Sequence, residues 1–516
     1  MRTKKSMYNM LVAIVANALT ILIGFISQGV FIKILGSEYL GLNGLFTNII
    51  SMLSIAELGF GTAIIFNLYK PLSENKKEEI KSLIQFYKKT YHVISLIILI
   101  AGIILIPFLR FIVTEPVSGV NIYIVYALFL ADTVVSYLAS YKRSIFLADQ
   151  QNYVVNIIHI VLLIIMNIIQ ILCLIFTKNY YLYLVIKFSF RLFENLIISW
   201  YSNVKYPYLK EKNIKKLSKR TLSDIKMKVK ALVFHQMGAF FVNGTDNLLI
   251  SMFFGLDIVG LYSNYYLIIN SINTIFNQAF SSITSSVGNL IVSKDKMRKD
   301  KLQVFKRLQF ANFWLATFTT TSLYILMEDF ISLWIGEEYL LSNVVLIALC
   351  FSHFYVMMRR SIGVFKEAAG IYYEDRFVPF IQSITNIVMS IVFAKLFGLV
   401  GIFMGTICSD FVLHFYSYPK FVYQKLFDRK RLEYIWKIMK YTLVVTISLV
   451  ITKLISSELL FLNIWIRFFV NCVLCIVMPN LLCFIIYHKT EEFSYYRAIF
   501  KNIVNKITRR KKSHAL

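Results

Sequence analysis

The residues that could do chemistry in this chain are charged side chains embedded in apolar segments. Residues 234–262 form one such segment, which carries Asp246 near the middle of an apolar run about as long as a membrane is thick. An ionisable group in lipid hydrocarbon is costly, so it normally faces protein or a water-filled cavity. A carboxylate there can take up a proton or Na⁺ and shift a protein between two states. Glu57 and Asp132 are further candidates for such ion coupling, and a fixed salt bridge is the alternative for each.

A second set of candidate site residues is cationic. The predicted helix at 181–203 carries Lys187, Arg191 and Glu194 on one face, because they are spaced by four and then three residues. Cations at membrane depth are costly unless they face protein or water, where they can bind an anion. Lys187 could reach the outer interface by snorkelling, whereas Arg191 lies deeper. Arg360, in the second half of the chain, is the third candidate cation.

Amide side chains form the third set. Asn273 and Asn277 belong to a ridge of Asn, Ser and Thr residues in the predicted helix at 258–290. Such a ridge is unusual for a helix in contact with lipid, because polar side chains in a membrane either join helices or line a cavity. Both interpretations are open for each uncharged residue.

The composition defines the class of protein that holds these residues. The chain has 516 residues, of which 58% are hydrophobic and 16% charged, and its mean hydropathy is +0.64. Soluble domains are nearer half apolar and a quarter charged, so the chain is predicted to be an all-α polytopic membrane protein. Hydropathy predicts about fourteen transmembrane helices. They lie at 8–35, 39–67, 89–112, 120–146, 153–176, 181–203, 229–255, 258–290, 307–328, 341–365, 376–397, 400–424, 437–456 and 463–487.

The chain has a net charge of +27, and the distribution of its Lys and Arg residues predicts a membrane topology rather than a nucleic-acid partner. Alternate connections between the predicted helices, together with both termini, hold 47 of the 55 Lys and Arg residues, and the opposite side holds six. This asymmetry fits the positive-inside rule, with both termini cytoplasmic in a multi-pass protein of the cell membrane. The basic loops are therefore predicted to contact anionic lipid headgroups, and no nucleic acid is expected as a partner.

Several motifs of enzymes are absent from the sequence. It contains no Gly-x-x-x-x-Gly-Lys-[Ser/Thr] loop for nucleotides, no His-Glu-x-x-His and no Gly-x-Ser-x-Gly. The six cysteines fall in or beside predicted helices, and Cys472-x-x-Cys475 has no partner cluster. The predicted outer loops are short. We therefore expect a protein that is not an enzyme and that has no cofactor and no metal.

An internal repeat organises the helices. The turn at 36–42 is restated at 255–261, an offset of 219, and Lys-Arg-Ser-Ile at 142–145 is similar to Arg-Arg-Ser-Ile at 359–362, an offset of 217. This offset spans six predicted helices, an even number, so both copies share one orientation in the membrane. Parallel repeats of this kind are typical of transporters, with the site between the halves.

The repeat predicts two parallel six-helix lobes around a central cavity, followed by a C-terminal helix pair. The predicted parts are an N-terminal lobe at 1–203, a basic cytoplasmic linker at 204–228, a C-terminal lobe at 229–426, and two additional transmembrane helices with a basic cytoplasmic tail at 427–516.

These lobes, with four short stretches, resemble bacterial polysaccharide-repeat-unit flippases of the multidrug/oligosaccharidyl-lipid/polysaccharide exporter superfamily. The stretches are Leu-Gly-Ser-Glu-Tyr-Leu-Gly at 35–41, Ala-Glu-Leu-Gly-Phe-Gly at 56–61, Thr-Asp-Asn at 245–247, and Gly-x-Asp-x-x-Gly-Leu-Tyr at 255–262. The resemblance covers most of the chain and is carried by the combination of motifs.

The resemblance implies a flippase that moves an undecaprenyl-diphosphate-linked oligosaccharide from the inner to the outer leaflet by alternating access. It further implies H⁺ or Na⁺ as the coupling ion, a role in capsule, exopolysaccharide or cell-wall polysaccharide synthesis, and a polysaccharide polymerase as a candidate partner. The diphosphate would need cations between the lobes, for which Lys187, Arg191 and Arg360 are the candidates. Asn273 and Asn277 would contact the sugars.

Two other functions compete with this interpretation. A multidrug or cation exporter of the same superfamily would favour an anionic, aromatic-lined cavity. At least two candidate interior cations favour an anionic lipid instead. A membrane scaffold of an envelope-synthesis complex would not need buried charges in both lobes.

Overall fold

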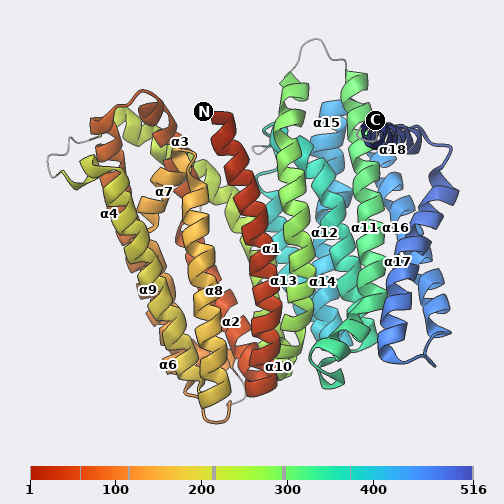
Figure 1. Cartoon of the computed structure of the whole chain (residues 1–516), viewed down its shortest axis with the longest axis horizontal. Coiled ribbons are helices and arrows are strands. Elements are labelled where there is room, and N and C mark those ends of the chain that lie inside the picture. The colour runs from red at the N-terminus through yellow and green to blue at the C-terminus, as the bar shows by residue number, and fades with distance from the viewer. Residues whose placement is uncertain are drawn as a thin grey trace. The chain divides into compact units, whose positions relative to one another are not determined.

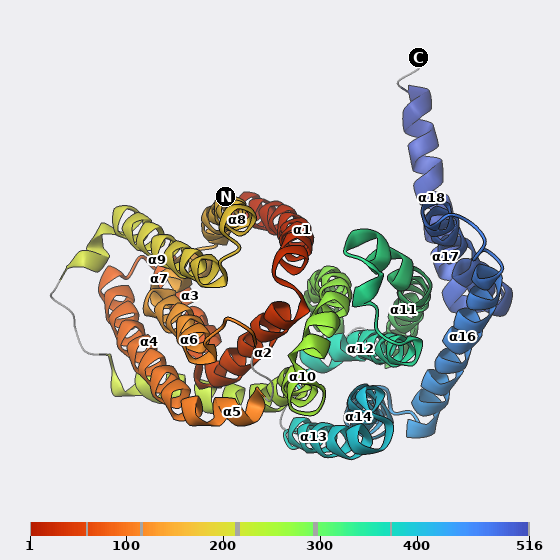
Figure 2. The ribbon, with the colours of Figure 1, turned by 90° about the horizontal axis from the view of Figure 1, so that it is seen from below.

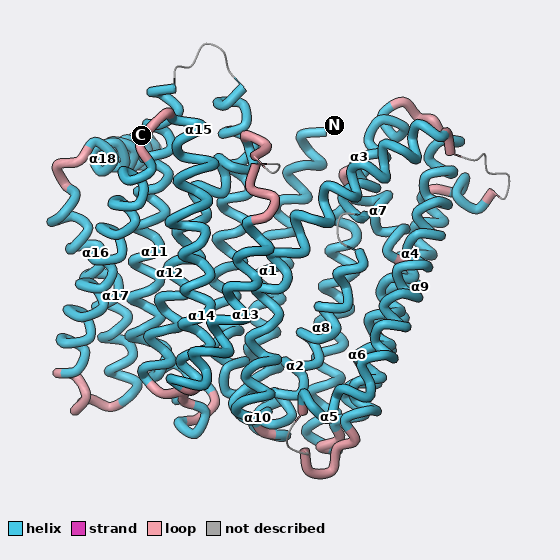
Figure 3. Tube along the Cα trace, turned by 180° about the vertical axis from the view of Figure 1, so that it is seen from behind, coloured by secondary structure: helices cyan, strands magenta, loops and turns pink. Residues whose placement is uncertain are grey.

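The computed structural model describes residues 2–57, 60–113, 117–211, 217–292, 298–371 and 374–513. Across these ranges the chain forms helices joined by loops, and no strand is present (Figure 3). The predicted all-α class is thus confirmed. Leu58 and Gly59 of the 56–61 stretch and residues 212–216 of the predicted linker lie outside the described residues.

The chain packs as two compact units, residues 1–267 and 268–516 (Figure 1). The division falls at Leu267, inside the long helix α10, and the lobe boundaries expected from the sequence repeat stay a prediction. The first unit contains α1 (Arg2–Leu35), α2 (Ser37–Leu53), α3 (Phe60–Ser73), α4 (Lys77–Leu105), α5 (Leu109–Ile112), α6 (Ile122–Leu138), α7 (Ser140–Ala148), α8 (Asn152–Thr177), α9 (Tyr180–Lys205) and the first part of α10 (Lys219–Val292).

The second unit begins within α10 and ends in an amphipathic helix. Its helices are α11 (Arg298–Trp334), α12 (Asn343–Ala368), α13 (Val378–Phe397), α14 (Leu399–Phe411), the π-helical segment Val412–Tyr423, α15 (Gln424–Phe427), α16 (Arg431–Ser457), α17 (Ile464–Tyr487) and α18 (Glu491–Ser513). The π-helical segment contains Pro419, whose missing N–H interrupts the regular α-helical ladder.

Most predicted transmembrane segments coincide with one of these helices or with part of one, whereas the segments predicted at 39–67, 89–112, 120–146 and 400–424 each extend over more than one helical element. By length and composition, nine helices in the described ranges are able to cross a membrane, or ten if the bent pair α6 and α7 counts as one span. The prediction of about fourteen is higher because it also counted charged segments and divided α10 into two spans. In α9, for example, Lys187, Arg191 and Glu194 interrupt an otherwise apolar helix.

Aromatic side chains fill the core of each unit. In the first unit, Phe46 packs edge-on against Tyr126, with ring centroids 5.4 Å apart. In the second unit, the rings of Phe313 and Tyr441 stack with centroids 3.8 Å apart and join α11 to α16. Viewed along the helices in Figure 2, α1 lies beside α8, and α13 lies beside α14. Because aromatic rings bury large areas, these contacts hold the helices that carry the charged side chains.

The two repeated turns adopt the same backbone conformation. Gly36, between α1 and α2, has φ 93° and ψ 177°, and Gly255, inside α10, has φ 85° and ψ 172°. A positive φ of this kind is strained for residues with a Cβ, so both positions require glycine. Gly255 also divides α10 into the two helices that the sequence predicts at 229–255 and 258–290.

The repeated turns also pack against each other within the first unit. A Cβ on Gly41 would lie 1.9 Å from the carbonyl oxygen of Leu256, and a Cβ on Gly260 would lie 2.0 Å from that of Ser37. The two contacts are reciprocal, because Gly41 and Gly260, like Ser37 and Leu256, occupy equivalent positions of the repeat. The sequence repeat therefore forms a close helix crossing, which holds α10 against α2 and permits no side chain at its two glycines.

We predict that Gly260→Ala strongly destabilises the protein, because its Cβ would overlap a backbone oxygen that cannot turn away. Overpacking of this kind typically costs about 1–3 kcal/mol, and here the obstacle is backbone rather than a flexible side chain. Thermal unfolding in detergent measures the effect. Gly363→Ala, in α12, is the matched control, because a Cβ there meets no atom within 4 Å. Equal melting temperatures for the two variants would contradict the observed packing.

Candidate functional site

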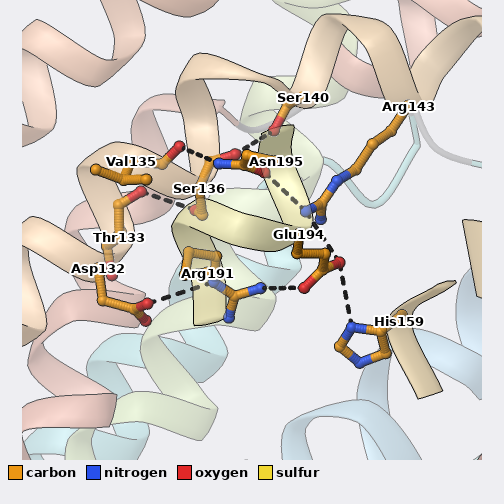
Figure 4. A network of polar contacts seen from close by, with 10 residues as sticks. All are labelled: Asp132, Thr133, Val135, Ser136, Ser140, Arg143, His159, Arg191, Glu194 and Asn195. Carbon is orange, nitrogen blue, oxygen red and sulfur yellow. Dashed lines mark hydrogen bonds and ion pairs between the residues drawn. The ribbon is translucent and has the colours of Figure 1, made fainter. Parts of the chain in front are cut away.

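Glu194 is the centre of an ionic network inside the first unit (Figure 4). Its carboxylate lies 3.0 Å from Nη2 of Arg143, 3.4 Å from Nη1 of Arg191 and 3.2 Å from Nδ1 of His159. These three partners come from α7, α9 and α8, so one buried carboxylate joins three helices. The network is partly exposed, since the side chains of Arg191 and His159 are 27% and 45% exposed, respectively.

The network extends from α9 to α6. Nε of Arg191 lies 3.4 Å from a carboxylate oxygen of Asp132. Asn195, one residue beyond Glu194, donates to the backbone oxygen of Val135 over 2.7 Å and accepts from Arg143 over 3.0 Å. The charged face predicted for α9, which carries Arg191 and Glu194, therefore contacts other helices of the protein, as the cost of membrane-embedded charge requires. Asp132, proposed from the sequence for ion coupling, lies next to Arg191, proposed for substrate binding.

Lys187 differs from Arg191 in having no carboxylate partner. Within the described residues no Asp or Glu oxygen lies within ion-pair distance of its ammonium, which instead lies 4.6 Å from the centre of the Phe129 ring. Asp132 and Arg191 are near enough to act on Lys187 electrostatically. Because Asp132 already pairs with Arg191, the positive charge of Lys187 is not neutralised by an ion pair.

A second cationic site lies in the second unit and brings three of the predicted residues together. The guanidinium of Arg360, on α12, donates to the side-chain oxygen of Asn277, and its Nη2 lies 3.0 Å from the side-chain oxygen of Asn273. The two asparagines are one turn apart on α10. Nε of Arg360 lies 3.2 Å from the sulfur of Met357. In the part of the chain that the structure describes, these neutral groups are the side-chain partners of Arg360, so its charge also remains unneutralised.

Arg359, the neighbour of Arg360, has the opposite environment. Its Nη1 lies 3.1 Å from Oδ1 of Asp410, whose side chain is 2% exposed, and Gln382 donates to the same oxygen over 3.1 Å. The other oxygen of Asp410 is buried with no hydrogen-bond partner among the described residues. Asp410 and Arg359 are therefore a buried ion pair that fixes α12 against α14.

An arginine–carboxylate ion pair of this kind occurs within each of the two units. Arg143 precedes Glu194 by 51 residues, and Arg359 precedes Asp410 by the same 51. The second pair thus repeats the first at an offset of 216 (359 − 143 and 410 − 194), close to the offsets of the sequence repeat. None of these four residues was proposed as a site residue from the sequence. A carboxylate recurring at a fixed distance after each Arg-Ser-Ile or Arg-Arg-Ser-Ile stretch was the available signal.

Glu57 and Asp246, the other proposed coupling carboxylates, lie outside these ion pairs. Glu57, in the 3-10 turn after α2, accepts a hydrogen bond from the Tyr91 hydroxyl over 3.2 Å. Asp246 is half-buried on α10, close enough to Tyr262 and Tyr266 to act on both electrostatically. Both carboxylates therefore have phenolic neighbours, which can donate hydrogen bonds and do not neutralise charge.

The described residues contain no group of three or more His, Cys, Asp or Glu side chains arranged to hold a metal ion. The six cysteines are free thiols. At both cationic sites, the Lys, Arg and Asn side chains are able to bind anionic or hydroxyl-rich groups.

Comparison with known proteins defines the fold. The sequence matches no protein-family model and no curated protein. Among solved structures, the chain is similar to the lipid II flippase MurJ in an inward closed conformation, with a TM-score of 0.62 and 16% identity over 93% of this chain and 99% of that one. It is also similar to an inward-facing multidrug resistance MATE family transporter of the MOP superfamily, with a TM-score of 0.53 and 12% identity over 84% and 98% of the two chains.

A third similar structure is a mutant form of the Vibrio cholerae MATE transporter VcmN, with a TM-score of 0.51 and 13% identity over 80% of this chain and 94% of that one. The protein therefore has the fold shared by MurJ and MATE transporters, and it is a multi-pass membrane protein. The neighbours are transporters and flippases rather than enzymes.

We predict that Arg359→Ala destabilises the second unit, because it leaves the Asp410 carboxylate buried without a cation. Breaking such a pair typically costs about 3–5 kcal/mol. Adding Asp410→Asn to Arg359→Ala should recover a large part of the loss, since the neutral amide removes the unpaired charge. Thermal unfolding of the two single variants and the double variant measures the coupling. Strictly additive losses would show that the pair contributes no coupling energy.

Proposed function

We propose that this protein is a flippase that moves undecaprenyl-diphosphate-linked oligosaccharide repeat units across the cytoplasmic membrane by ion-coupled alternating access. The observation that carries the proposal is a pair of cations, Lys187 in the first unit and Arg360 in the second, that have no carboxylate partner among the described residues. Each belongs to a helix bundle in which the nearby acids already have an arginine partner.

The distribution of charge favours an anionic cargo. Glu194 and Asp132 are paired with Arg143 and Arg191. A positive charge held in a low-dielectric site without a counter-ion is costly, and an incoming anion relieves that cost. A diphosphate suits such a site, because Lys and Arg form short, charge-assisted hydrogen bonds to phosphate oxygens. A cationic drug would instead add to the unneutralised positive charge.

The surroundings of Arg360 also suit the sugar part of the cargo. Asn273 and Asn277 keep amide groups beside the guanidinium, and amides both donate and accept hydrogen bonds. Many weak hydrogen bonds of this kind can recognise sugar hydroxyls. The fold gives further support, since one similar structure is that of a lipid II flippase.

In this proposal the carboxylates have different roles. Asp132 neutralises and positions Arg191. Asp246 and Glu57, which both have phenolic neighbours, are the proposed candidates for binding H⁺ or Na⁺. Binding of the ion would favour one of two conformations and so drive the cycle. The charge distribution further supports cytoplasmic termini, and a polysaccharide polymerase is the proposed downstream partner.

We predict that Lys187→Gln and Arg360→Gln insert normally but reduce surface polysaccharide to about a tenth or less, with Arg191→Ala similarly defective. Losing a charge-assisted bond to phosphate costs about 1.5–3 kcal/mol, or roughly ten- to a hundredfold in binding. The measurement is complementation of a flippase-null strain, with the amount of each variant in the membrane checked. Lys33→Gln and Lys395→Gln are matched controls, because both lysines are exposed. Normal surface polysaccharide in the site variants would contradict the assignment. Failure of the wild-type protein to complement the strain would favour the competing function, a membrane scaffold.

We predict that Asp246→Asn still binds the lipid-linked substrate but no longer responds to an imposed H⁺ or Na⁺ gradient. Asparagine keeps the size of aspartate but carries no charge, so it cannot exchange a proton and binds a cation more weakly. Flipping in proteoliposomes with and without each gradient tests this. Glu38→Gln, at the exposed end of the repeated turn, is the control. Gradient-stimulated flipping by Asp246→Asn would exclude Asp246 as the coupling residue.

A further inference from the structure

A basic cavity lies in the second unit, away from the Arg360 site. Its volume is about 610 Å³, and it is formed near the first residues of α16 and α18, the last residue of α17 and the first turns of α11. Four lysines line it, Lys306, Lys430, Lys437 and Lys440, with two carboxylates. The cavity thus gathers more positive than negative charge at one end of α16 and α17, two helices able to cross a membrane.

The carboxylates in the cavity already have partners. Glu492 pairs with Lys437, with a distance of 3.6 Å between their charged atoms. Glu433 accepts a hydrogen bond from the Tyr423 hydroxyl over 3.3 Å. Within the described ranges, the ammonium groups of Lys306, Lys430 and Lys440 have no carboxylate partner, although Lys306 is near enough to Lys437 to act on it electrostatically. Three unneutralised lysines around one cavity repel one another unless an anion lies between them.

An apolar track leads from the cavity along α16. Leu432, Trp436, Met439 and Leu443 are spaced by four, three and four residues, so they share one helix face. Their side chains are 62%, 58%, 48% and 61% exposed, respectively, and Leu432 and Trp436 also line the cavity. An exposed tryptophan beside lysines is typical of the level of lipid headgroups, with the apolar residues beyond it in the hydrocarbon. A ligand with a charged head and an apolar tail fits both features.

From these observations we infer that the cavity binds the phosphate headgroup of an anionic glycerophospholipid, whose acyl chain lies along the exposed face of α16. The three lysines without carboxylate partners hold the phosphate, Lys437 stays paired with Glu492, and Trp436 lies at the boundary between headgroup and chain. A free phosphate ion would satisfy the lysines and leave the apolar track unused. This site is independent of the proposed transport function, because it shares no residue with the Lys187 and Arg360 sites.

Native mass spectrometry of the full chain in a neutral detergent tests the inference. Phosphatidylglycerol and phosphatidylcholine with identical acyl chains are offered to the wild type and to the variant Lys306→Gln/Lys430→Gln/Lys440→Gln. Each lysine near a headgroup contributes about fivefold in affinity. We therefore expect the triple variant to bind phosphatidylglycerol at least about tenfold more weakly, with binding of phosphatidylcholine unchanged. None of the three substitutions breaks a described ion pair.

The matched control is Lys88→Gln/Lys89→Gln/Lys226→Gln, which removes the same charge at lysines that lie outside the cavity and outside the described ion pairs. It should retain phosphatidylglycerol as the wild type does. Equal loss in both triple variants, or equal retention in both, would overturn the site. Displacement of the lipid by millimolar inorganic phosphate would overturn the lipid as the ligand. If the triple variant does not fold, the exposed Lys440→Gln alone carries the same comparison.

Discussion

The cost of placing charge within membrane-spanning helices is the constraint on which the rest of this structure depends. In each unit a buried acid is held by an arginine: Glu194 by Arg143 in the first unit and Asp410 by Arg359 in the second. Because the two ion pairs recur with the same spacing, we interpret them as structural features of the repeat, which neutralise the buried acids. Each unit also contains a cation, Lys187 or Arg360, that has no carboxylate partner among the described residues. These two cations define the proposed substrate site, whereas the ion pairs have a structural role.

The repeat has a second physical consequence, at the crossing of the two glycine-containing turns. Gly41 and Gly260 each meet a backbone oxygen of the opposite turn, so the helices approach as closely as backbones allow. The contact fixes where α10 begins its second half, and Asn264 on that half accepts a hydrogen bond from Gln28 over 2.8 Å. The α10 helix, which carries both Asp246 and the asparagines beside Arg360, is therefore anchored at the repeated turn.

Sequence reasoning succeeded where the relevant contacts are local along a helix. The spacing of Lys187, Arg191 and Glu194 placed them on one face, and the class of the fold followed from hydropathy. It did not predict that Arg143 and His159 would meet Glu194, because three helices bring them together and no periodicity encodes that contact. For the same reason, it did not predict that Asp132, a proposed coupling acid, pairs with Arg191, which is a tertiary contact visible only in the structure.

The central claim is that the unneutralised cations select an anionic lipid-linked cargo. The most direct measurement reconstitutes the protein in liposomes and follows two cargoes side by side, an undecaprenyl-diphosphate-linked oligosaccharide and a lipophilic organic cation. We expect the protein to move the diphosphate-linked glycan between leaflets and to leave the distribution of the cation unchanged. Transport of the cation without movement of the glycan would contradict it.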